Sequence, residues 1–287
     1  MQLEQLNIQE IQDILAKDKY FIHAKDDEEN TLLHHAIFRE SLEDAKFLIE
    51  HGACPLVYNS HIMNPFSLAC ILDNSDILDF LLFTCKDAIS PLDQCFMLAT
   101  ATSKGCYNTT KCLLVNGFDC NLYYRDDPII YWAVQSNSVS IMELLNNFGA
   151  DLNAYNEYGD SALYLAAGDE DAIEIVRFLL AHGALVDGNS KCSCTPLTLS
   201  CAYGNNDIAE VLLLHGAEIE AQDSEGLTPL LNALRYGRID TIRLLLKYGA
   251  NKAAVDKKKR DMNYYIGKLR KKTREEMITM LSNYGKW

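Results

Sequence analysis

The sequence predicts an all-α solenoid in which short helix–turn–helix units stack on one another. Two observations predict this fold class. Small residues recur at a nearly constant spacing, and a glycine follows most of them at a fixed distance, at the end of an apolar helical run. Two markers that stay in phase over most of the 287 residues indicate an internal repeat, and a repeat of this length is typical of stacked helical units.

The two markers define about seven units. The small residues are spaced by 33, 30, 34, 33, 34 and 33 residues, and they are Ala36, Ala69, Ala99, Ala133, Ala166, Ser200 and Ala233. The glycines that follow are Gly52, Gly117, Gly149, Gly183, Gly216 and Gly249. The distance from small residue to glycine position is 16 in five units, counting Cys85, which stands where the second unit would have its glycine.

Each unit has the same local logic. A turn such as Asp223–Gly226 comes first, and Thr228-Pro229-Leu230 then supplies a capping hydroxyl with proline at the first helical position, where its missing N–H costs nothing. The first helix carries the small residue, which lets its neighbour approach closely. A second helix ends at a glycine in the left-handed conformation. Neither helix can bury its apolar stripe alone, so the units must stack.

This pattern resembles the ankyrin repeat family, whose units read D-x-x-G-x-T-P-L-H-x-A and end L-L-x-x-G-A-D-V-N-A. The resemblance is strongest in residues 191–256, through Thr195-Pro196-Leu197 and Thr228-Pro229-Leu230, and it covers roughly residues 25–256. Gly149-Ala150-Asp151-Leu152-Asn153-Ala154 matches the end of the family's unit. The resemblance implies an all-α ankyrin-repeat solenoid with short β-hairpin or turn fingers and terminal caps.

The expected organisation has three parts. Residues 1–24 are expected to form an N-terminal capping helix, with Ile8, Ile11 and Leu15 among the apolar residues at helical spacing. Residues 25–256 hold about seven repeats. Residues 257–287 are expected to form a basic, degenerate C-terminal capping repeat that Gly285 closes, because an uncovered last unit would expose its apolar strip.

Three units depart from the pattern. Cys85 at a glycine position predicts strain, since a left-handed residue with a Cβ is unfavourable. The third unit lacks Thr-Pro-Leu-His and holds two extra residues between Ala99 and Gly117, and the fifth unit holds one extra residue after Gly168. The array is therefore expected to be irregular near residues 83–110.

The resemblance implies that a partner protein binds the concave surface, formed by the finger tips and the exposed side of the first helices. Carried onto this chain, the finger positions include Tyr124, Arg125, Asp127, Glu157, Tyr158, Asp160, Lys191, Cys192, Glu225 and Leu227, and the first-helix positions include Phe38, Arg39, Gln135, Tyr203, Arg235 and Tyr236. Tyr and Arg are enriched at interface hot spots. Residues 123–125 and 155–158 lie in neighbouring units and are expected to form one patch. The alternative is that some of these aromatic side chains only brace adjacent fingers.

Charge is distributed unevenly. The formal charge of the chain is −14, but Lys252–Arg274 holds ten Lys and Arg against two Asp, a net of +8, which leaves −22 elsewhere. The candidate basic patch consists of Lys257, Lys258, Lys259, Arg260, Lys271 and Lys272. It could serve nuclear import or contact nucleic acid or an acidic membrane. The alternative is a solvated capping helix with its cations near the helix terminus.

No residue set predicts a catalytic, metal or cofactor site. Cys192, Cys194, Cys201 and His215 could be imagined as a zinc set, but the C-x-C spacing is unusual and other cysteines occupy positions expected in the core. No phosphate-binding glycine loop, zinc-protease motif or nucleophile elbow occurs. His34 stands in the Thr-Pro-Leu-His position, where the resemblance implies a backbone hydrogen bond between units.

These observations predict a non-enzymatic scaffold or adaptor that binds another protein, is a monomer and has no small-molecule substrate. No apolar run is long enough to cross a bilayer, the N-terminus lacks the features of a signal peptide, and ten cysteines without an export signal indicate reduced thiols. The expected location is the cytoplasm. Two alternatives stay open. One is a secreted effector or inhibitor that blocks a target in the cytoplasm or nucleus of a host cell. The other is an enzyme with a cryptic site in the irregular third repeat.

Overall fold

The computed structural model describes residues 3–188 and 194–284, and these residues form two compact units. The first unit contains residues 1–125 and 143–150, and the second contains residues 126–142 and 151–287. Helix α9 (Val139–Asn147) contributes residues to both units. The expected Gly285, Lys191 and Cys192 lie outside the described residues.

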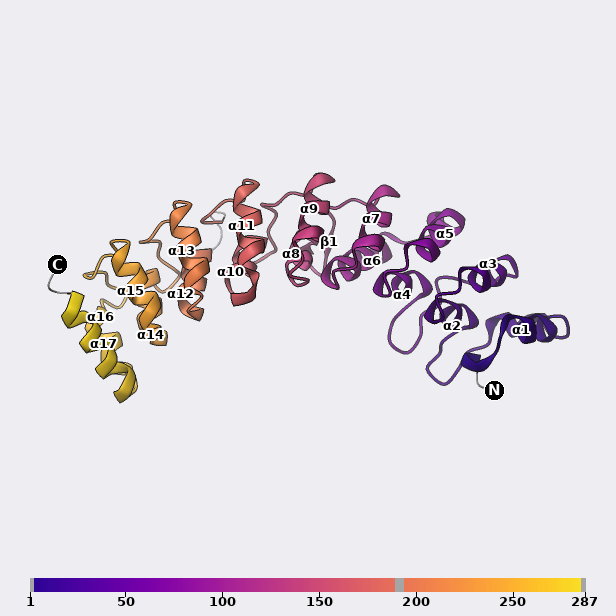
Figure 1. Ribbon diagram of the computed structural model, residues 1–287, viewed down its shortest axis with the longest axis horizontal. Helices are drawn as coiled ribbons and strands as arrows, with labels where there is room; N and C mark the ends of the chain where they lie inside the picture. Colours follow the sequence, from indigo (N-terminus) through magenta and orange to yellow (C-terminus); the bar gives the residue numbers. More distant parts are fainter. Residues whose placement is uncertain (1–2, 189–193, 285–287) are drawn as a thin grey trace. The chain divides into compact units, whose positions relative to one another are not determined.

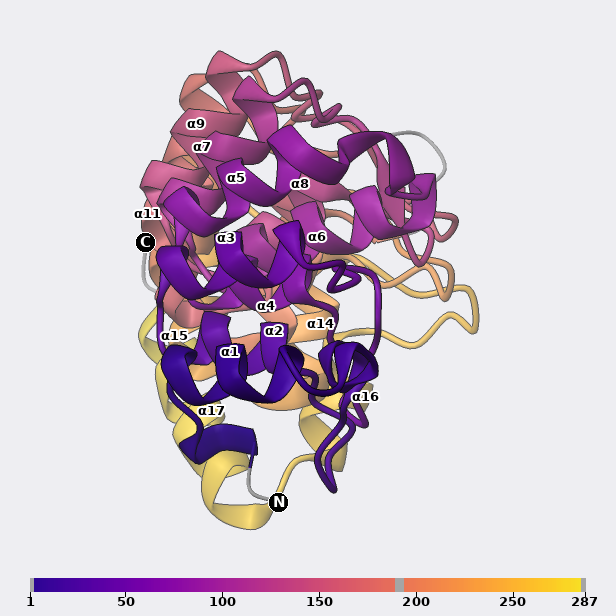
Figure 2. The ribbon, with the colours of Figure 1, turned by 90° about the vertical axis from the view of Figure 1, so that its right-hand side faces the viewer.

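The first unit stacks three helical pairs. Its first helices are α2 (Leu32–Phe38), α4 (Pro65–Ile71) and α6 (Pro91–Ser103), and its second helices are α3 (Leu42–Glu50), α5 (Ser75–Cys85) and α7 (Tyr107–Val115). Helix α4 packs on α2 and α6, and α5 packs on α3 and α7. Figure 2 shows α3, α5 and α7 as a row of their own. Before these pairs come η1 (Leu3–Gln5), α1 (Ile8–Leu15) and η2 (Lys19–His23), with Ile11 and Leu15 of α1 buried.

The second unit has the same internal arrangement. Its first helices are α8 (Ile129–Val134), α10 (Ala162–Ala167), α12 (Pro196–Tyr203), α14 (Pro229–Tyr236) and α16 (Met262–Lys268), and its second helices include α11 (Ile173–Ala181), α13 (Asn206–Leu214), α15 (Ile239–Lys247) and α17 (Lys271–Tyr284). Each first helix packs on the next, and so does each second helix from α11 to α17. The two rows are visible in Figure 1.

Strands are short within the described residues. β1 (Tyr123–Tyr124) and β2 (Asp127–Pro128) form a hairpin, and two isolated bridges close other fingers, Lys25 with Thr31 and Tyr155 with Ser161. The all-α solenoid with short hairpin or turn fingers, which the sequence predicts, is therefore confirmed.

The small residues and the glycines that mark the repeat have the predicted roles in the structure. Ala36, Ala69, Ala133 and Ala233 are fully buried between helices, as is Ser200. All six marker glycines have positive φ. At the caps, the Thr195 hydroxyl accepts from the Thr198 N–H at 3.2 Å, and the Thr228 hydroxyl accepts from the Leu231 N–H at 3.3 Å.

In the third unit the small residue of the repeat is Ala101, not Ala99 as the sequence spacing suggested. In four other units the residue five positions after the small residue donates its N–H to that residue's carbonyl, as Asn205 does to Ser200 at 2.9 Å. In the third unit Cys106 donates to Ala101 at 2.9 Å. Ala101 stands 16 residues before Gly117, so no extra residues separate the two markers.

The third unit also has a helix cap, although the sequence pattern predicts none. The Ser90 hydroxyl accepts from the Asp93 N–H at 3.1 Å, and Pro91 follows at the first helical position. Helix α6 therefore begins well before the position at which other first helices begin, and it occupies chain that forms a finger elsewhere.

The prediction of strain at Cys85 is wrong. Cys85 has φ −136°, and the chain continues from α5 into the short helix η3 (Lys86–Ala88) without a left-handed residue. In the fifth unit the extra residue after Gly168 is absorbed by another short helix, η4 (Glu170–Ala172), which leads into α11. Short 3₁₀ turns thus accommodate both departures.

His34 makes the predicted hydrogen bond between units. Its Nε2 lies 3.0 Å from the carbonyl oxygen of Met63, while its Nδ1 lies 2.8 Å from the Thr31 hydroxyl. Burial lowers the pKa of His34 below its ordinary value of 6.5. The neutral ring is therefore part of the folded structure.

The lowered pKa of His34 predicts acid sensitivity. As the pH falls below about 6.5, the unfolded chain takes up this proton before the folded one, so the contribution of His34 to stability is full above that pH and is lost below it. His34→Gln keeps a capping-box residue but removes the titration. We expect the decrease in melting temperature between pH 7.5 and pH 5, measured by circular dichroism, to be smaller for the variant; an equal decrease would contradict the assignment.

Candidate partner-binding surface

The fingers owe their shape to one Asp or Asn at their start. Its side-chain oxygen accepts from the N–H groups two and four residues later, which fixes the turn without help from the tip residues. For Asp223 these distances are 2.8 and 2.9 Å, to Glu225 and Leu227. The same pattern occurs at Asp26, Asn59, Asn156 and Asp256. The tips are therefore presented on a self-supporting backbone.

The β1–β2 hairpin is built differently. Arg125 and Asp126 both have positive φ, 52° and 65°, as in the tight turns that suit the twist of a hairpin. The Arg125 guanidinium lies 5.3 Å from the ring centroid of Tyr124, and that ring packs 5.6 Å from Phe96. Arg125 is exposed and Tyr124 is half-buried, so Tyr124 partly braces α6, which is the alternative considered for these aromatic residues.

The next finger exposes Tyr158 and Glu157. Tyr158 is 73% exposed, and a hydrogen bond with Glu157 raises the pKa of its phenol. Asp127 accepts from the Asn156 side chain at 3.0 Å and Asp160 is half-buried, so both are partly committed to the fold. The boundary between the two units runs between Arg125 and Asp126, so the single patch expected from residues 123–125 and 155–158 stays a prediction.

Three of the predicted first-helix residues line one groove in the second unit. Tyr203 at the end of α12 is 58% exposed, and Tyr236 at the end of α14 is 55% exposed. With Arg235 they border a groove of about 410 Å³, which Leu199 and Ala202 also line. The groove combines aromatic surface with a guanidinium, the chemistry of an interface hot spot.

Arg235 is held in place in this groove. Its Nη1 lies 2.9 Å from the Glu225 carboxylate of the adjacent finger, and its guanidinium lies 5.9 Å from the Tyr236 ring centroid. Arg238 donates to the Ala202 carbonyl at 3.0 Å. Finger and first helices therefore support one another here. Leu227, in contrast, is fully buried, which corrects its placement among the exposed finger positions.

The predicted residues of the first unit lie beside its first finger. Phe38 is half-exposed and Arg39 is exposed, at the end of α2. Arg39 donates to the Glu4 carbonyl at 3.4 Å and to Asp44 at 3.3 Å. Both border a groove of about 580 Å³ next to Asp26 and Glu28. Gln135, which follows α8 in the second unit, is exposed.

The basic stretch consists of a finger and a helix start, not of a solvated capping helix with favourably placed cations. Lys257–Arg260 belong to a finger that opens at Asp256, and Lys271 and Lys272 begin α17. A helix N-terminus disfavours cations. The three lysines of the finger are exposed, and the Lys257 ammonium donates to the Ser224 carbonyl at 2.9 Å.

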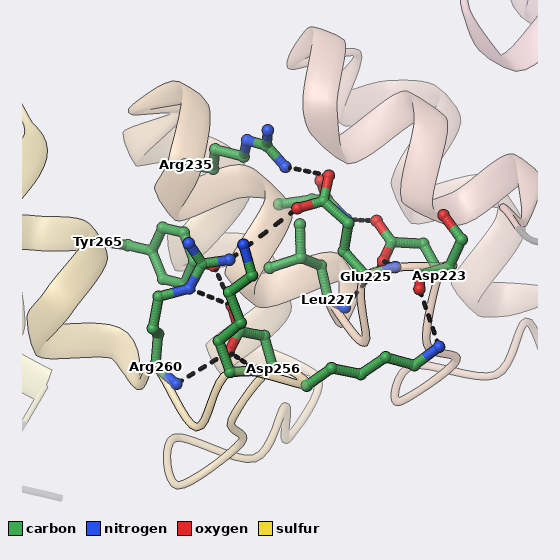
Figure 3. Close-up of polar contacts among 11 residues, drawn as sticks. Asp223, Glu225, Leu227, Arg235, Asp256, Arg260 and Tyr265 are labelled. Carbon is green, nitrogen blue, oxygen red and sulfur yellow. Dashed lines mark hydrogen bonds and ion pairs between the residues drawn. The ribbon is translucent and has the colours of Figure 1, made fainter.

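Arg260 is not a free cation of the basic patch. It donates from Nε to the Asp256 carboxylate, and its Nη2 lies 3.9 Å from Glu225. The Tyr265 hydroxyl also donates to Asp256, at 2.6 Å. Figure 3 shows how these side chains, with Arg235, join the two neighbouring fingers.

Asp256 is the centre of this network. Burial alone would raise the pKa of Asp256, but hydrogen bonds from Tyr265, Arg260 and Lys258 outweigh it and lower the pKa to about 2. Burial and the bond to Asp256 raise the pKa of Tyr265 to about 12. Sequence reasoning missed the pairing of Asp256 with Tyr265, which is nine residues later in the chain. The signal was available, because the Asp that opens two other fingers also bonds to the residue nine positions later, Asp26 to His35 and Asp223 to Asn232.

The cysteines in the described part of the chain are free thiols. Burial raises the pKa of Cys201 to about 12 and that of Cys112 to about 11, and it also raises the pKa of Cys95 and Cys106 in the third unit. A raised pKa disfavours the thiolate that a catalytic cysteine needs. Over residues 3–188 and 194–284, no group of three or more His, Cys, Asp or Glu is placed to hold a metal ion, and no helix could span a membrane.

Comparison with known proteins identifies the family. The family described as "Ankyrin repeats (3 copies)" matches residues 96–190 and 171–256, and "Ankyrin repeat" matches residues 28–60. The chain belongs to the ankyrin repeat family. The ankyrin-repeat solenoid predicted from the resemblance is thus the fold of the family to which the chain belongs. Ankyrin repeats are generally non-enzymatic and bind other proteins, so this chain is a protein–protein interaction module.

Several curated ankyrin-containing proteins are similar to it. The B-cell lymphoma 3 protein homolog of Mus musculus is 29% identical over 162 residues, which is 54% of this chain and 36% of that protein. The human transient receptor potential cation channel subfamily A member 1 is 26% identical over 183 residues, 59% of this chain and 16% of that protein. The ankyrin repeat and KH domain-containing protein mask-1 of Caenorhabditis elegans is 38% identical over 79 residues, 27% of this chain and 3% of that protein. The matches cover only part of these relatives.

Proposed function

We propose that this ankyrin chain is a scaffold or adaptor that holds a partner protein in the groove of the second unit. The observation that carries the proposal is the meeting of Tyr203, Arg235 and Tyr236 beside the finger that opens at Asp223. Two half-exposed tyrosines supply contact area with polar tips, and Arg235 supplies a charge whose position is already fixed by Glu225. A pre-positioned surface loses little side-chain freedom on binding.

Exposed finger residues would extend the contact and select the partner. Tyr158 and Glu157 are exposed finger positions in the second unit, and Arg125 is an exposed one in the first. Phe38 and Arg39 border a separate groove beside Asp26 and Glu28. In this proposal the partner is a folded protein or a peptide segment, without a cofactor or small-molecule substrate.

The free cysteines in the described part of the chain support a reducing compartment, so we place the protein in the cytoplasm. A second candidate, an effector that blocks a target surface in a host cell, would use the same groove. Its binding would inhibit the target's activity, whereas an adaptor's binding would leave that activity intact.

Affinity capture from cell extract tests the groove. We expect Tyr203→Ala with Tyr236→Ala to remove the specifically captured partner, by a loss of at least tenfold, because truncation of central aromatic residues typically costs more than about 1.4 kcal/mol. Arg177→Ala on the second helix α11 is the control, since Arg177 is exposed and outside the groove. The same partner set with the double variant would contradict the proposal. A third variant, Tyr124→Ala with Arg125→Ala and Tyr158→Ala, tests the finger contribution.

A further inference from the structure

The fingers at the two ends of the array have the same backbone conformation and opposite charge. Asp26–Asn30 is called the first finger and Asp256–Arg260 the last finger. In each, the opening Asp accepts from the N–H groups two and four residues later at 2.8 to 2.9 Å, and the fourth residue is left-handed, with φ 60° at Glu29 and 57° at Lys259. The three positions between the ends hold Asp-Glu-Glu in the first finger and Lys-Lys-Lys in the last.

These charges exceed those of the other described fingers. The first finger carries four carboxylates, and the last carries four cations and one carboxylate. The finger that opens at Asn59 has no Asp, Glu, Lys or Arg, and the one that opens at Asp223 has two carboxylates. Strong opposite charge is therefore confined to the terminal fingers of the described array.

Two pairs of neighbouring fingers are joined by the same backbone hydrogen bond. The second residue of a finger donates its N–H to the carbonyl of the third residue of the preceding finger. Ser60 donates in this way to Glu28 at 2.9 Å, and Lys257 donates to Glu225 at 3.0 Å. At the ends of the described array this bond has no partner: no described group donates to the Lys258 carbonyl, and no described group accepts from the Asp27 N–H.

The first finger borders an open groove on its free side. The groove of about 580 Å³ is lined by Glu4, Asp27 and Glu28 and by the apolar Leu3 and Phe38. Of the cations nearby, Lys25 is paired with Glu29 at 3.2 Å and Arg39 with Asp44 at 3.3 Å, so the groove keeps unneutralised carboxylates. Lysine side chains, with an apolar stem and a charged end, suit such a surface.

We propose that two copies of this chain associate head to tail, with the last finger of one copy stacked on the first finger of the next. The Lys258 carbonyl would accept from the Asp27 N–H of the neighbouring copy, which repeats the hydrogen bond that joins fingers within the array. The lysine tips would lie along the acidic groove. Because the two surfaces differ, the contact is heterologous, and further copies can add in the same direction. This association replaces the expectation of a monomer and is independent of the groove at Tyr203.

Charge complementarity favours a second copy over an acidic peptide or nucleic acid. The rest of the chain outside Lys252–Arg274 carries −22, which repels a polyanion over most of the surface. A second copy instead brings its own acidic finger to the lysines and its own lysines to the acidic finger. Exposed pairs of this kind are weak and salt-dependent. The association should therefore be strongest at high protein concentration and low ionic strength.

Sedimentation equilibrium of the full chain over a concentration series tests the proposal. We expect the average mass of the natural protein to rise with concentration at low ionic strength and to fall on addition of salt. Lys258→Glu with Lys259→Glu changes the net charge of the last finger from +3 to −1, and Asp27→Lys with Glu28→Lys changes that of the first finger from −4 to 0. Each variant is expected to associate at least about tenfold more weakly, because the lysine variant replaces attraction by repulsion and the Asp27 and Glu28 variant removes the attraction. Lys271→Glu with Lys272→Glu, an equal charge change outside the fingers, should leave association unchanged.

Restoration is the decisive result. An equimolar mixture of the two variants should associate although neither does so alone, because the unchanged last finger of one variant (+3) then meets the unchanged first finger of the other (−4). Circular dichroism checks that all variants fold, since these side chains are exposed. A natural protein whose mass does not change with concentration would overturn the proposal. The proposal would also be overturned if the Lys258 and Lys259 variant associated more weakly but the Asp27 and Glu28 variant did not. The lysines would then contact another surface.

Discussion

Replacement of Asp256 by Asn is expected to lower the free energy of unfolding by about 2 kcal/mol at neutral pH. The amide keeps one oxygen for the N–H groups of Lys258 and Arg260, but its NH₂ then faces the groups that donate to the second oxygen, the Tyr265 hydroxyl and the Arg260 guanidinium. Urea unfolding measured by circular dichroism gives the difference.

Asp223→Asn is the matched control for this variant. Asp223 opens the preceding finger with the same two backbone contacts, but its second oxygen accepts only from the neutral Asn232 side chain. We expect a loss of less than about 1 kcal/mol. Equal losses at both positions would show that the charged network at Asp256 adds nothing beyond the finger turn.

The effect of Asp256→Asn should also depend on pH. Because the pKa of Asp256 is about 2 in the folded chain and near 3.8 in the unfolded chain, the carboxylate stabilises the fold fully above about pH 4 and loses this contribution as the pH falls toward 2. The stability difference between the natural protein and the variant should be constant from pH 7 to pH 5 and decrease below pH 4. A difference that decreases already between pH 7 and pH 5 would contradict the assignment.

Replacement of Gly226 by Ala is expected to lower the free energy of unfolding by about 2 to 3 kcal/mol. Gly226 has φ +81°, and a Cβ there would lie 2.8 Å from the backbone nitrogen of Lys257, which belongs to the next finger. The substitution would therefore combine backbone strain with separation of the last two fingers. Hydrogen exchange at the amides of Lys258 and Arg260 should become faster.

Gly216→Ala separates these two causes. Gly216 has φ +86°, but a Cβ at Gly216 would meet nothing within 4 Å, so only the strain of about 1 kcal/mol applies. The excess loss for Gly226→Ala over Gly216→Ala measures the contact between fingers. If the two variants lose the same stability, the fingers do not need the close approach that the structure shows.

Features that depend on neighbouring residues could be predicted from the sequence. The glycines that end second helices, the Thr-Pro caps and the burial of Ala36 or Ala233 follow from short patterns that each unit repeats. The hydrogen bond from His34 to the next unit was implied by the family resemblance, and its geometry bears that out.

The third unit could not be read in the same way because two alanines compete. Ala99 and Ala101 are both small and buried, and only the bond from Cys106 to Ala101 decides the register. Gly105, four residues after Ala101 as Gly204 is after Ser200, was the available signal. Ser90 and Pro91 were overlooked because they precede Ala101 by more residues than a cap does in other units.

The surface was the hardest part to predict, since exposure at a finger position depends on contacts between units. Leu227 follows the finger pattern but is apolar, and the neighbouring helices bury it. Arg260 looks like a free cation in the sequence, yet Asp256 and Glu225 both pair with it. These pairings join residues from two fingers, so a pattern within one unit does not show them.

The Asp or Asn that opens each finger has a consequence for evolution and for design. Because this residue shapes the turn through backbone groups, exposed tip side chains such as those of Tyr158 and Lys258 are not needed to form it. Mutation can then exchange them freely, and a lineage can acquire a new recognition specificity without an intermediate that misfolds. Randomised tips on an unaltered scaffold would be the laboratory equivalent of that history.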